Sequence, residues 1–226
     1  MDGRYYSYKE NDSIEAVIFD LDGTLIDTEK FFQQAWLEAS AQHGYILKPE
    51  MRLKLRSLGH PFNENQFREW FGNECDFSCI QTLCKKIFRA ISEERGIELK
   101  PGAKELLEFL KEKKMITVLS TSGNTERAEY CLKKTGILQY FDKLVCSDMV
   151  QYGKPSPDTY LYACHVLNID PKNIFAVEDS PNGVSSAFAA GCKVIMVPDL
   201  TQPDDELTPK IFACVKSLLD ITQLIG

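Results

Sequence analysis

Five short runs of apolar and β-branched residues lie along the chain: 16–19, 116–119, 144–146, 174–177 and 194–197. Helical patterns separate the last four runs from one another. Continuous apolar runs of this length are typical of strands buried on both faces, and strands that alternate with helices predict a parallel sheet. The pattern therefore predicts an α/β fold with a Rossmann-like parallel sheet as its core and helices on both of its faces.

The expected helix boundaries agree with this alternation. A helix over about 125–134 should end at Gly136, because glycine readily adopts the left-handed backbone conformation that closes helices. Two other helices should begin at Ser156-Pro157 and at Ser180-Pro181, with serine as the N-cap and proline at the first helical position. Each of these helices would begin soon after a strand.

The interval from about 30 to 99 differs from the rest of the chain. It holds helical patterns but no convincing strand, so we interpret it as an all-helical insertion between the first strand and the remaining sheet. Pro101-Gly102 marks the return to the sheet and opens another helix over 103–113. The predicted domains are a core of residues 14–29 and 100–226 and an inserted domain of residues 30–99.

Composition and charge narrow the classes of function. The 226 residues are 44% hydrophobic and 26% charged, as in a folded globular protein. The net charge of −7 argues against a general binder of nucleic acid or anionic membranes, since both need a basic surface. Residues 1–12 carry no apolar signal-peptide segment, and no run reaches 18 apolar residues. We therefore expect a cytoplasmic protein with no membrane partner.

The eight cysteines favour the same location. They form no CxxC pair, and most lie inside apolar runs, which is typical of buried, reduced thiols. Cys75, Cys79 and Cys84 are clustered, but their spacing does not fit a zinc site. A structural metal is not expected.

Polar residues follow four of the predicted strands. Ligands of open parallel sheets bind beyond the carboxyl ends of the strands, so these residues should converge on one site. In strand order they are Asp20 and Asp22; Ser120, Thr121 and Ser122; Ser147, Asp148 and then Lys154; Glu178 and Asp179.

These side chains suit phosphoryl transfer. The carboxylates of two strand ends would repel one another without a cation, and oxygen ligands favour Mg²⁺. The Ser120 hydroxyl and the Thr121 N–H precede a helix N-terminus, where anions are favoured, and Lys154 adds a positive charge. A carboxylate in this setting can attack phosphorus to form an aspartyl-phosphate, which divides a very slow displacement into two faster ones.

Four segments, in order, resemble the signatures of the haloacid dehalogenase (HAD) superfamily. They are DLDGTLID at 20–27, VLSTS at 118–122, GKPSPD at 153–158 and VEDSPNG at 177–183. The resemblance covers the chain from about residue 14 to its end. The insertion after the first signature is similar to the small helical cap domain of the β-phosphoglucomutase-like branch.

The resemblance implies a role for each matching residue. Asp20 would be the nucleophile and Asp22 the general acid and base. Asp20, the backbone carbonyl of Asp22, and Asp179 would hold Mg²⁺, while Glu178 would orient metal-bound water. The groups that would bind the phosphoryl group are the Ser120 hydroxyl, the Thr121 N–H and Lys154.

The resemblance also separates possible reactions. Dehalogenases of the superfamily lack the second aspartate, so Asp22 points to phosphate esters. Mutases of this branch carry a histidine after the first signature and a Lys-Gly-x-x-Arg segment in the cap. Here Phe32 stands at the histidine and residues 58–62 replace the basic segment, which favours a phosphatase. Basic residues close by leave the mutase open; they are Arg52, Lys54, Arg56, His60 and Arg68.

We therefore expect a Mg²⁺-dependent phosphatase that hydrolyses a small phosphorylated metabolite, a sugar phosphate in particular. A β-phosphoglucomutase-type mutase is the alternative enzyme, and a non-catalytic phospho-ligand or partner-binding protein is the alternative of another class. The core and cap can complete a site within one chain, so a monomer is expected.

Overall fold

The computed structural model describes residues 13–225. The expectation that residues 1–12 hold no signal peptide lies outside this range. Within residues 13–225, no helix combines the length and the apolar character needed to cross a bilayer. Six of the eight cysteines are buried, and the described chain contains no disulfide among them.

A six-stranded sheet in the order β3-β2-β1-β4-β5-β6 forms the core, and every neighbouring pair is parallel. Its strands are β1 (Ala16–Phe19), β2 (Ile116–Ser120), β3 (Lys143–Val145), β4 (Ile174–Glu178), β5 (Lys193–Met196) and β6 (Ala213–Cys214). The five strands expected from the apolar runs are confirmed. The edge strand β6 was not predicted, because two residues are too few to make a recognisable run.

The central strand β1 aligns the chemistry of its neighbours. Phe19, its last residue, pairs with Leu119 of β2 and with Val177 of β4. The residues that follow each of these positions therefore reach the same edge of the sheet together.

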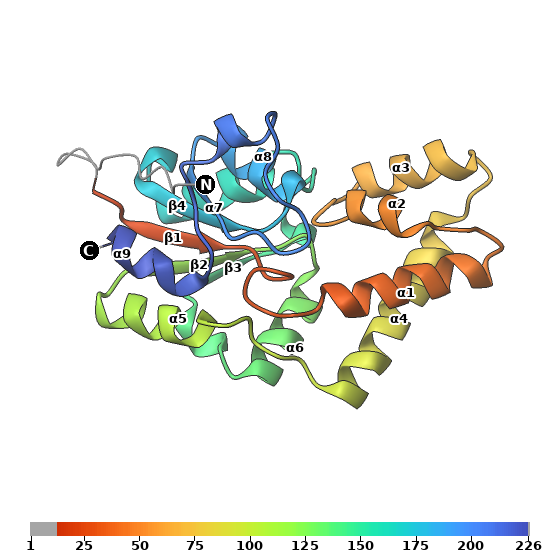
Figure 1. The fold of residues 1–226 in the computed structure, drawn as a ribbon, viewed down its shortest axis with the longest axis horizontal. Coiled ribbons are helices and arrows are strands. Elements are labelled where there is room, and N and C mark those ends of the chain that lie inside the picture. Colours follow the sequence, from red (N-terminus) through yellow and green to blue (C-terminus); the bar gives the residue numbers. More distant parts are fainter. Residues whose placement is uncertain (1–12, 226) are drawn as a thin grey trace.

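Helices cover both faces of the sheet, as predicted. They are α5 (Ala103–Glu112), α6 (Thr125–Thr135), α7 (Asp158–Leu167), α8 (Pro181–Ala189) and α9 (Thr222–Ile225). In Figure 1, α7 and α8 lie on one face and α5, α6 and α9 on the other. Alternate residues of β1 follow this division: Val17 and Phe19 pack in the cluster that includes α5 and α6, and Ala16 and Ile18 in the cluster with α7 and α8.

The expected helix boundaries hold with one correction. Gly136 closes α6 with a φ of 70°, and the Ser180 hydroxyl caps α8 by accepting from the Gly183 N–H at 3.2 Å. Helix α7, however, begins at Asp158 with Pro157 as its N-cap. The Ser156 hydroxyl donates to the Asp158 carboxylate at 2.8 Å, so it is not available to cap the helix.

The insertion is all-helical, as predicted, and lies beside the sheet (Figure 1). Its helices are α1 (Glu29–Gln42), α2 (Pro49–Lys54), α3 (Phe62–Phe71) and α4 (Phe77–Arg95). Phe67 is completely buried and packs against Trp36 and Phe77 at ring centroid distances of 5.3 and 5.0 Å. Aromatic side chains thus supply much of the insertion's own core. The domain limits at residues 30 and 99 stay a prediction.

Candidate active site

Lys154 lies at the centre of the candidate site. Its ammonium group donates to Asp20 Oδ1 at 2.6 Å, to Glu178 Oε1 at 2.6 Å and to the Ser120 carbonyl at 2.9 Å. These three partners come from the ends of the adjacent strands β1, β4 and β2, and the Lys154 side chain is fully buried. Burial lowers the pKa of Lys154, but the charges of Asp20 and Glu178 outweigh it and keep the pKa above the ordinary value.

The acidic side chains around Lys154 could hold a metal ion. One oxygen from each of Asp20, Glu178 and Asp179 lies within 4.8 Å of the others. Asp20 Oδ2 and Glu178 Oε2 are buried and have no hydrogen-bond partner. Buried carboxylate oxygens without a donor are costly, and a hard cation such as Mg²⁺ is the kind of partner they suit. The residues present therefore fit the cation expected from the sequence.

The raised pKa of Asp20 also fits a cation at this site. Burial raises the pKa of Asp20 to about 8, with Lys154 opposing the shift and the charges of Glu178 and Asp22 adding to it. Burial also raises the pKa of Asp179. A positive charge beside these carboxylates would favour their ionised forms.

Asp179 is held by residues on two sides. The Thr24 hydroxyl donates to its Oδ1 at 3.2 Å, and the Arg56 guanidinium donates to its Oδ2. Gly23 passes against the same carboxylate with a φ of +84°, and a Cβ there would overlap Asp179. Glycine is thus required in the first signature both for its backbone conformation and for this close approach.

Asp22 is held by two side chains, Thr28 just before α1 and Arg127 of α6. Its carboxylate accepts from the Thr28 hydroxyl at 2.6 Å and from two guanidinium nitrogens of Arg127 at 2.9 and 2.6 Å. Burial would raise the pKa of Asp22, but the charge and hydrogen bonds of Arg127, with that of Thr28, bring it below the ordinary value. Arg127 packs against Phe32 and Phe88 of the insertion at 5.1 and 5.6 Å from their ring centroids.

Sequence reasoning missed Arg127. It stands in the first turn of α6, just after the second signature, and this position is the signal that could have marked it.

The residues of the second signature lie at the site in unequal ways. Ser120 Oγ is buried without a hydrogen-bond partner. The Thr121 N–H, which was expected to bind the phosphoryl group, donates to the Val145 carbonyl at 3.0 Å instead. It continues the hydrogen bonding between β2 and β3. The Thr121 hydroxyl accepts from Gly123 N–H at 3.1 Å and lies 3.4 Å from Arg127.

Tyr160 is a second residue that the sequence did not single out. Its buried hydroxyl donates to Glu178 Oε1 at 2.6 Å, and its ring centroid lies 5.2 Å from the Lys154 ammonium. Tyr160 therefore supports both charged groups from the α7 side of the sheet.

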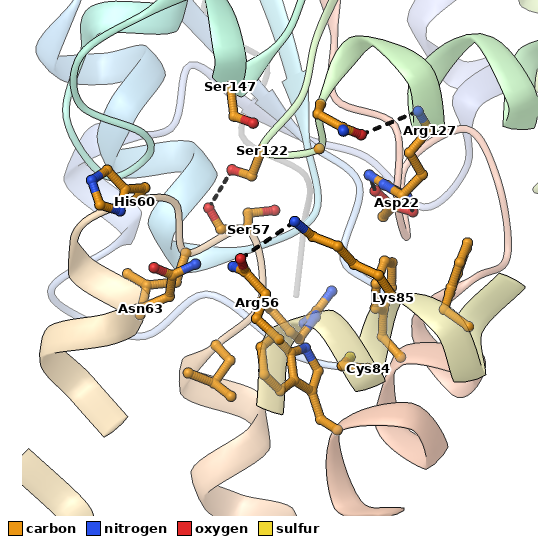
Figure 2. Close-up of a pocket in the computed structure, with 18 of the residues that line it drawn as sticks. Asp22, Arg56, Ser57, His60, Asn63, Cys84, Lys85, Ser122, Arg127 and Ser147 are labelled. Atoms are coloured by element: carbon orange, nitrogen blue, oxygen red, sulfur yellow. Dashed lines mark hydrogen bonds and ion pairs between the residues drawn. The ribbon is translucent and has the colours of Figure 1, made fainter. Parts of the chain in front are cut away.

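A cavity of about 600 Å³ opens between the core and the insertion, within the usual range for small-molecule sites. Asp22 and Arg127 lie on one side of it, His60 and Asn63 on the opposite side, and the Lys85 side chain extends between them (Figure 2). Further lining groups are Phe32, Trp36, Arg52, Arg56, Gln81, Cys84, Phe88, Ser122 and Ser147.

Three of the basic residues that left the mutase open are engaged in ion pairs. Arg52 and Arg56 are buried and pair with Glu29 and Asp179. Arg68 pairs with Glu64 at 2.8 Å on its own helix and does not line the cavity. Of the remaining two residues, His60 lines the cavity and Lys54 does not.

This chain is similar to proteins of a known family. The model of the haloacid dehalogenase-like hydrolase family matches residues 17–197. A phosphorylated carbohydrates phosphatase of Thermotoga maritima is 33% identical over 186 residues, covering 80% of this chain and 84% of that protein. Hexitol phosphatase A of Escherichia coli is 34% identical over 180 residues, covering 80% of this chain and 81% of that protein.

A solved structure has the same arrangement of elements. It is a mutant of CbbY from Rhodobacter sphaeroides in complex with xylulose-(1,5)bisphosphate, with a TM-score of 0.78 and 27% identity, covering 91% of this chain and 95% of that one.

Proposed function

Because this chain belongs to the haloacid dehalogenase-like hydrolase family, close to CbbY and the sugar phosphate phosphatases, we propose that it is a Mg²⁺-dependent phosphatase of a small phosphorylated metabolite, in particular a sugar phosphate. The observation that carries this proposal is Asp20. It is buried beside Lys154, Glu178 and Asp179, and its Oδ2 has no hydrogen-bond partner. A free carboxylate oxygen in a cluster of charged groups is suited to attack phosphorus.

In the proposed first step, Asp20 Oδ2 attacks the phosphorus of the ester. The bond from phosphorus to the sugar oxygen breaks, and the phosphoryl group is transferred to Asp20 as an aspartyl-phosphate. Lys154 donates to Asp20 Oδ1 at 2.6 Å, which leaves the other oxygen without a protein partner. In the second step water attacks the same phosphorus, releases inorganic phosphate and restores the carboxylate.

Asp22 is the proposed proton carrier. It donates a proton to the departing sugar oxygen and then accepts one from the attacking water, the general acid and base pattern of such two-step displacements. Thr28 and Arg127 hold its carboxylate at the cavity, within reach of the substrate.

The transferring phosphoryl group is proposed to bind between the second and third signatures. The Ser120 hydroxyl, the Thr121 hydroxyl and Lys154 supply its donors. Mg²⁺, held by Asp20, Asp179 and the Asp22 carbonyl, would supply positive charge that balances the phosphoryl oxygens. Glu178 orients the surroundings of that cation, and Tyr160 and Lys154 fix Glu178 in turn.

A phosphatase is favoured over a mutase by the insertion. A mutase must bind a phosphate at both ends of its substrate and therefore needs free basic groups opposite the core. The guanidinium groups of Arg52 and Arg56 already have carboxylate partners, and Phe32 stands beside Arg127 where mutases carry histidine. The basic side chains of the insertion that line the cavity without a carboxylate partner among the described residues are Lys85 and His60. The insertion acts as a cap that limits access of bulk water to the site. A monomeric state and a cytoplasmic location stay predictions of the sequence.

The test is to incubate the purified chain with Mg²⁺ and a panel of small phosphate esters. The panel includes β-glucose 1-phosphate, with and without a trace of glucose 1,6-bisphosphate, and both inorganic phosphate and glucose 6-phosphate are followed. Phosphate release from sugar phosphates is expected, and Asp20→Asn should lower kcat by about 10⁴-fold or more because the nucleophile is lost.

Other outcomes would overturn the proposal. Bisphosphate-dependent formation of glucose 6-phosphate without phosphate release would identify a mutase. No turnover of any ester, together with binding of one of them, would identify the non-catalytic class. Undiminished turnover by Asp20→Asn would remove the nucleophile assignment.

A further inference from the structure

A short segment of the insertion is fastened to the core at three places. This docking segment, residues 54–60, begins at the last residue of α2 and makes up most of the connection to α3. The Gly59 N–H donates to the Lys154 carbonyl at 2.8 Å, and the Gly153 N–H donates to the His60 carbonyl at 2.7 Å. A Cβ on either glycine would lie 2.6 Å from the Cα of the other, so the two backbones meet directly.

The other two fastenings involve the second and fourth signatures. The Ser122 hydroxyl donates to the Ser57 carbonyl at 2.7 Å, a bond marked in Figure 2. The Asn182 side-chain amide donates to the Lys54 and Arg56 carbonyls at 3.1 and 2.8 Å. The docking segment is therefore held mainly through its backbone.

The Arg56 side chain of the docking segment extends into the core. It is completely buried, and its guanidinium donates to Asp179 Oδ2 and to the Thr201 hydroxyl, the latter at 2.9 Å. Glu29 and Asp199 also lie within 3.7 and 3.8 Å of guanidinium nitrogens. A positive charge from the insertion thus rests on a carboxylate of the candidate cation site.

We propose that Arg56 is a positioning residue through which the insertion competes with a divalent cation for Asp179, so that docking of segment 54–60 and occupation of the cation site oppose each other. The inference rests on the proposed function in one respect, that Asp179 is a cation ligand.

The physical reason is that both oxygens of Asp179 already have protein donors, Thr24 on Oδ1 and Arg56 on Oδ2. A cation that binds Asp179 together with Asp20 approaches the Arg56 guanidinium. The positive charges of the cation and of the Arg56 guanidinium, bound to the same buried carboxylate, repel each other strongly. If docked Arg56 weakens cation binding by some factor, the cation must weaken docking by the same factor.

The first test measures Mg²⁺ binding to the full chain by isothermal titration calorimetry without substrate. Arg56→Gln removes the charge and should lower the Kd for Mg²⁺ by at least about fivefold, the lower end of common coupling effects. Arg56→Lys keeps a positive charge and should bind Mg²⁺ much as the unchanged chain does. Asn182→Ala removes two hydrogen bonds of the docking segment but no charge, and should tighten binding by less than Arg56→Gln.

An unchanged or raised Kd in Arg56→Gln would overturn the inference, because a residue with a merely structural role would not strengthen cation binding when removed. A larger effect of Asn182→Ala than of Arg56→Gln would overturn it as well. If the unchanged chain hydrolyses sugar phosphates with Mg²⁺, such results remove the inference alone. If it neither binds Mg²⁺ nor releases phosphate, the proposed function fails with it.

The second test uses the unchanged chain and so does not depend on a variant that folds. Amide hydrogen exchange at Gly59 and Gly153, followed by NMR with and without Mg²⁺, reports directly on the two backbone hydrogen bonds of docking. Faster exchange at both amides with Mg²⁺ is expected. Equal or slower exchange would overturn the inference.

Discussion

Among the cations that the described residues bury, Lys154 in the core and Arg56 in the insertion differ in how they are held. Lys154 contacts three groups that all belong to the ends of neighbouring strands. Arg56 reaches its carboxylate partner from a segment of the insertion that is held to the core mainly by backbone hydrogen bonds. Lys154 depends on the arrangement of strand ends, whereas Arg56 depends on the docking of segment 54–60 for its place beside Asp179.

The same division applies to the proposed reacting groups and to the residues that line the cavity. The groups proposed to react lie on the sheet, where the parallel register fixes their mutual distances. Most of the residues that line the cavity lie on the insertion. The proposed reaction centre and most of the cavity wall thus belong to different parts of the fold.

Removal of Lys154 should have the largest effect on stability. Lys154→Met leaves the buried carboxylates of Asp20 and Glu178 without their shared cation, which should cost about 3–5 kcal/mol in the free energy of unfolding. Urea unfolding of the metal-free chain measures it. Arg56→Gln is the matched variant and should cost less, since release of segment 54–60 can expose Glu29 and Asp179 to water. An equal or larger loss in Arg56→Gln would break the comparison.

The pH dependence of stability should show the cost of burying the ionised carboxylates of the core. Burial first, with Glu178 and Asp22 adding to it against Lys154, raises the pKa of Asp20 from 3.8 to about 8. Between these values the folded chain binds more protons than the unfolded chain, so its stability falls as pH rises from about 4 to 8. The Tm in EDTA should therefore fall by several degrees from about pH 5 to about pH 8.

Asp20→Asn is the control for this experiment and should flatten the slope in part, because Asp179 has a raised pKa and acts in the same direction. Saturating Mg²⁺ should flatten it in the unchanged chain. A Tm that stays level in EDTA across this range would contradict the assignment of a raised pKa to Asp20.

The smallest expected effect concerns Tyr160. Tyr160→Phe removes the hydroxyl that donates to Glu178 Oε1 and keeps the ring beside Lys154. Loss of one such hydrogen bond should cost about 1 kcal/mol in the free energy of unfolding. Because Glu178 supports the cation site, the Kd for Mg²⁺ should also rise, which calorimetry measures. A stability loss with an unchanged Kd would assign Tyr160 to packing alone.

How far the sequence predicts the site depends on where each residue lies. Asp20, Ser120, Glu178 and Asp179 could be located because each ends or follows a strand, and parallel strands bring such positions to one edge. Lys154 was recognisable from its signature. The fold class followed from the same apolar runs, except for the edge strand β6.

The missed residues share a different property. Arg127 and Tyr160 lie on helices, and their partners lie 105 and 18 positions away. Arg56 was named only as one of the basic residues near residues 58–62, without its partner. Which side of a helix meets the site depends on how whole segments pack, and no local pattern encodes that. The Thr121 N–H was misassigned for a related reason, because β2 continues its hydrogen bonding to β3 one residue beyond its end.

The facing glycines Gly59 and Gly153 have a consequence for how such a protein can diversify. Their contact is made by main chain alone, so it places no demand on neighbouring side chains beyond keeping the two glycines small. Substitutions elsewhere along the insertion can then reshape the cavity while its seat on the core stays intact. Point mutations in the insertion can alter which substrates fit the cavity, while the residues at the strand ends stay unchanged.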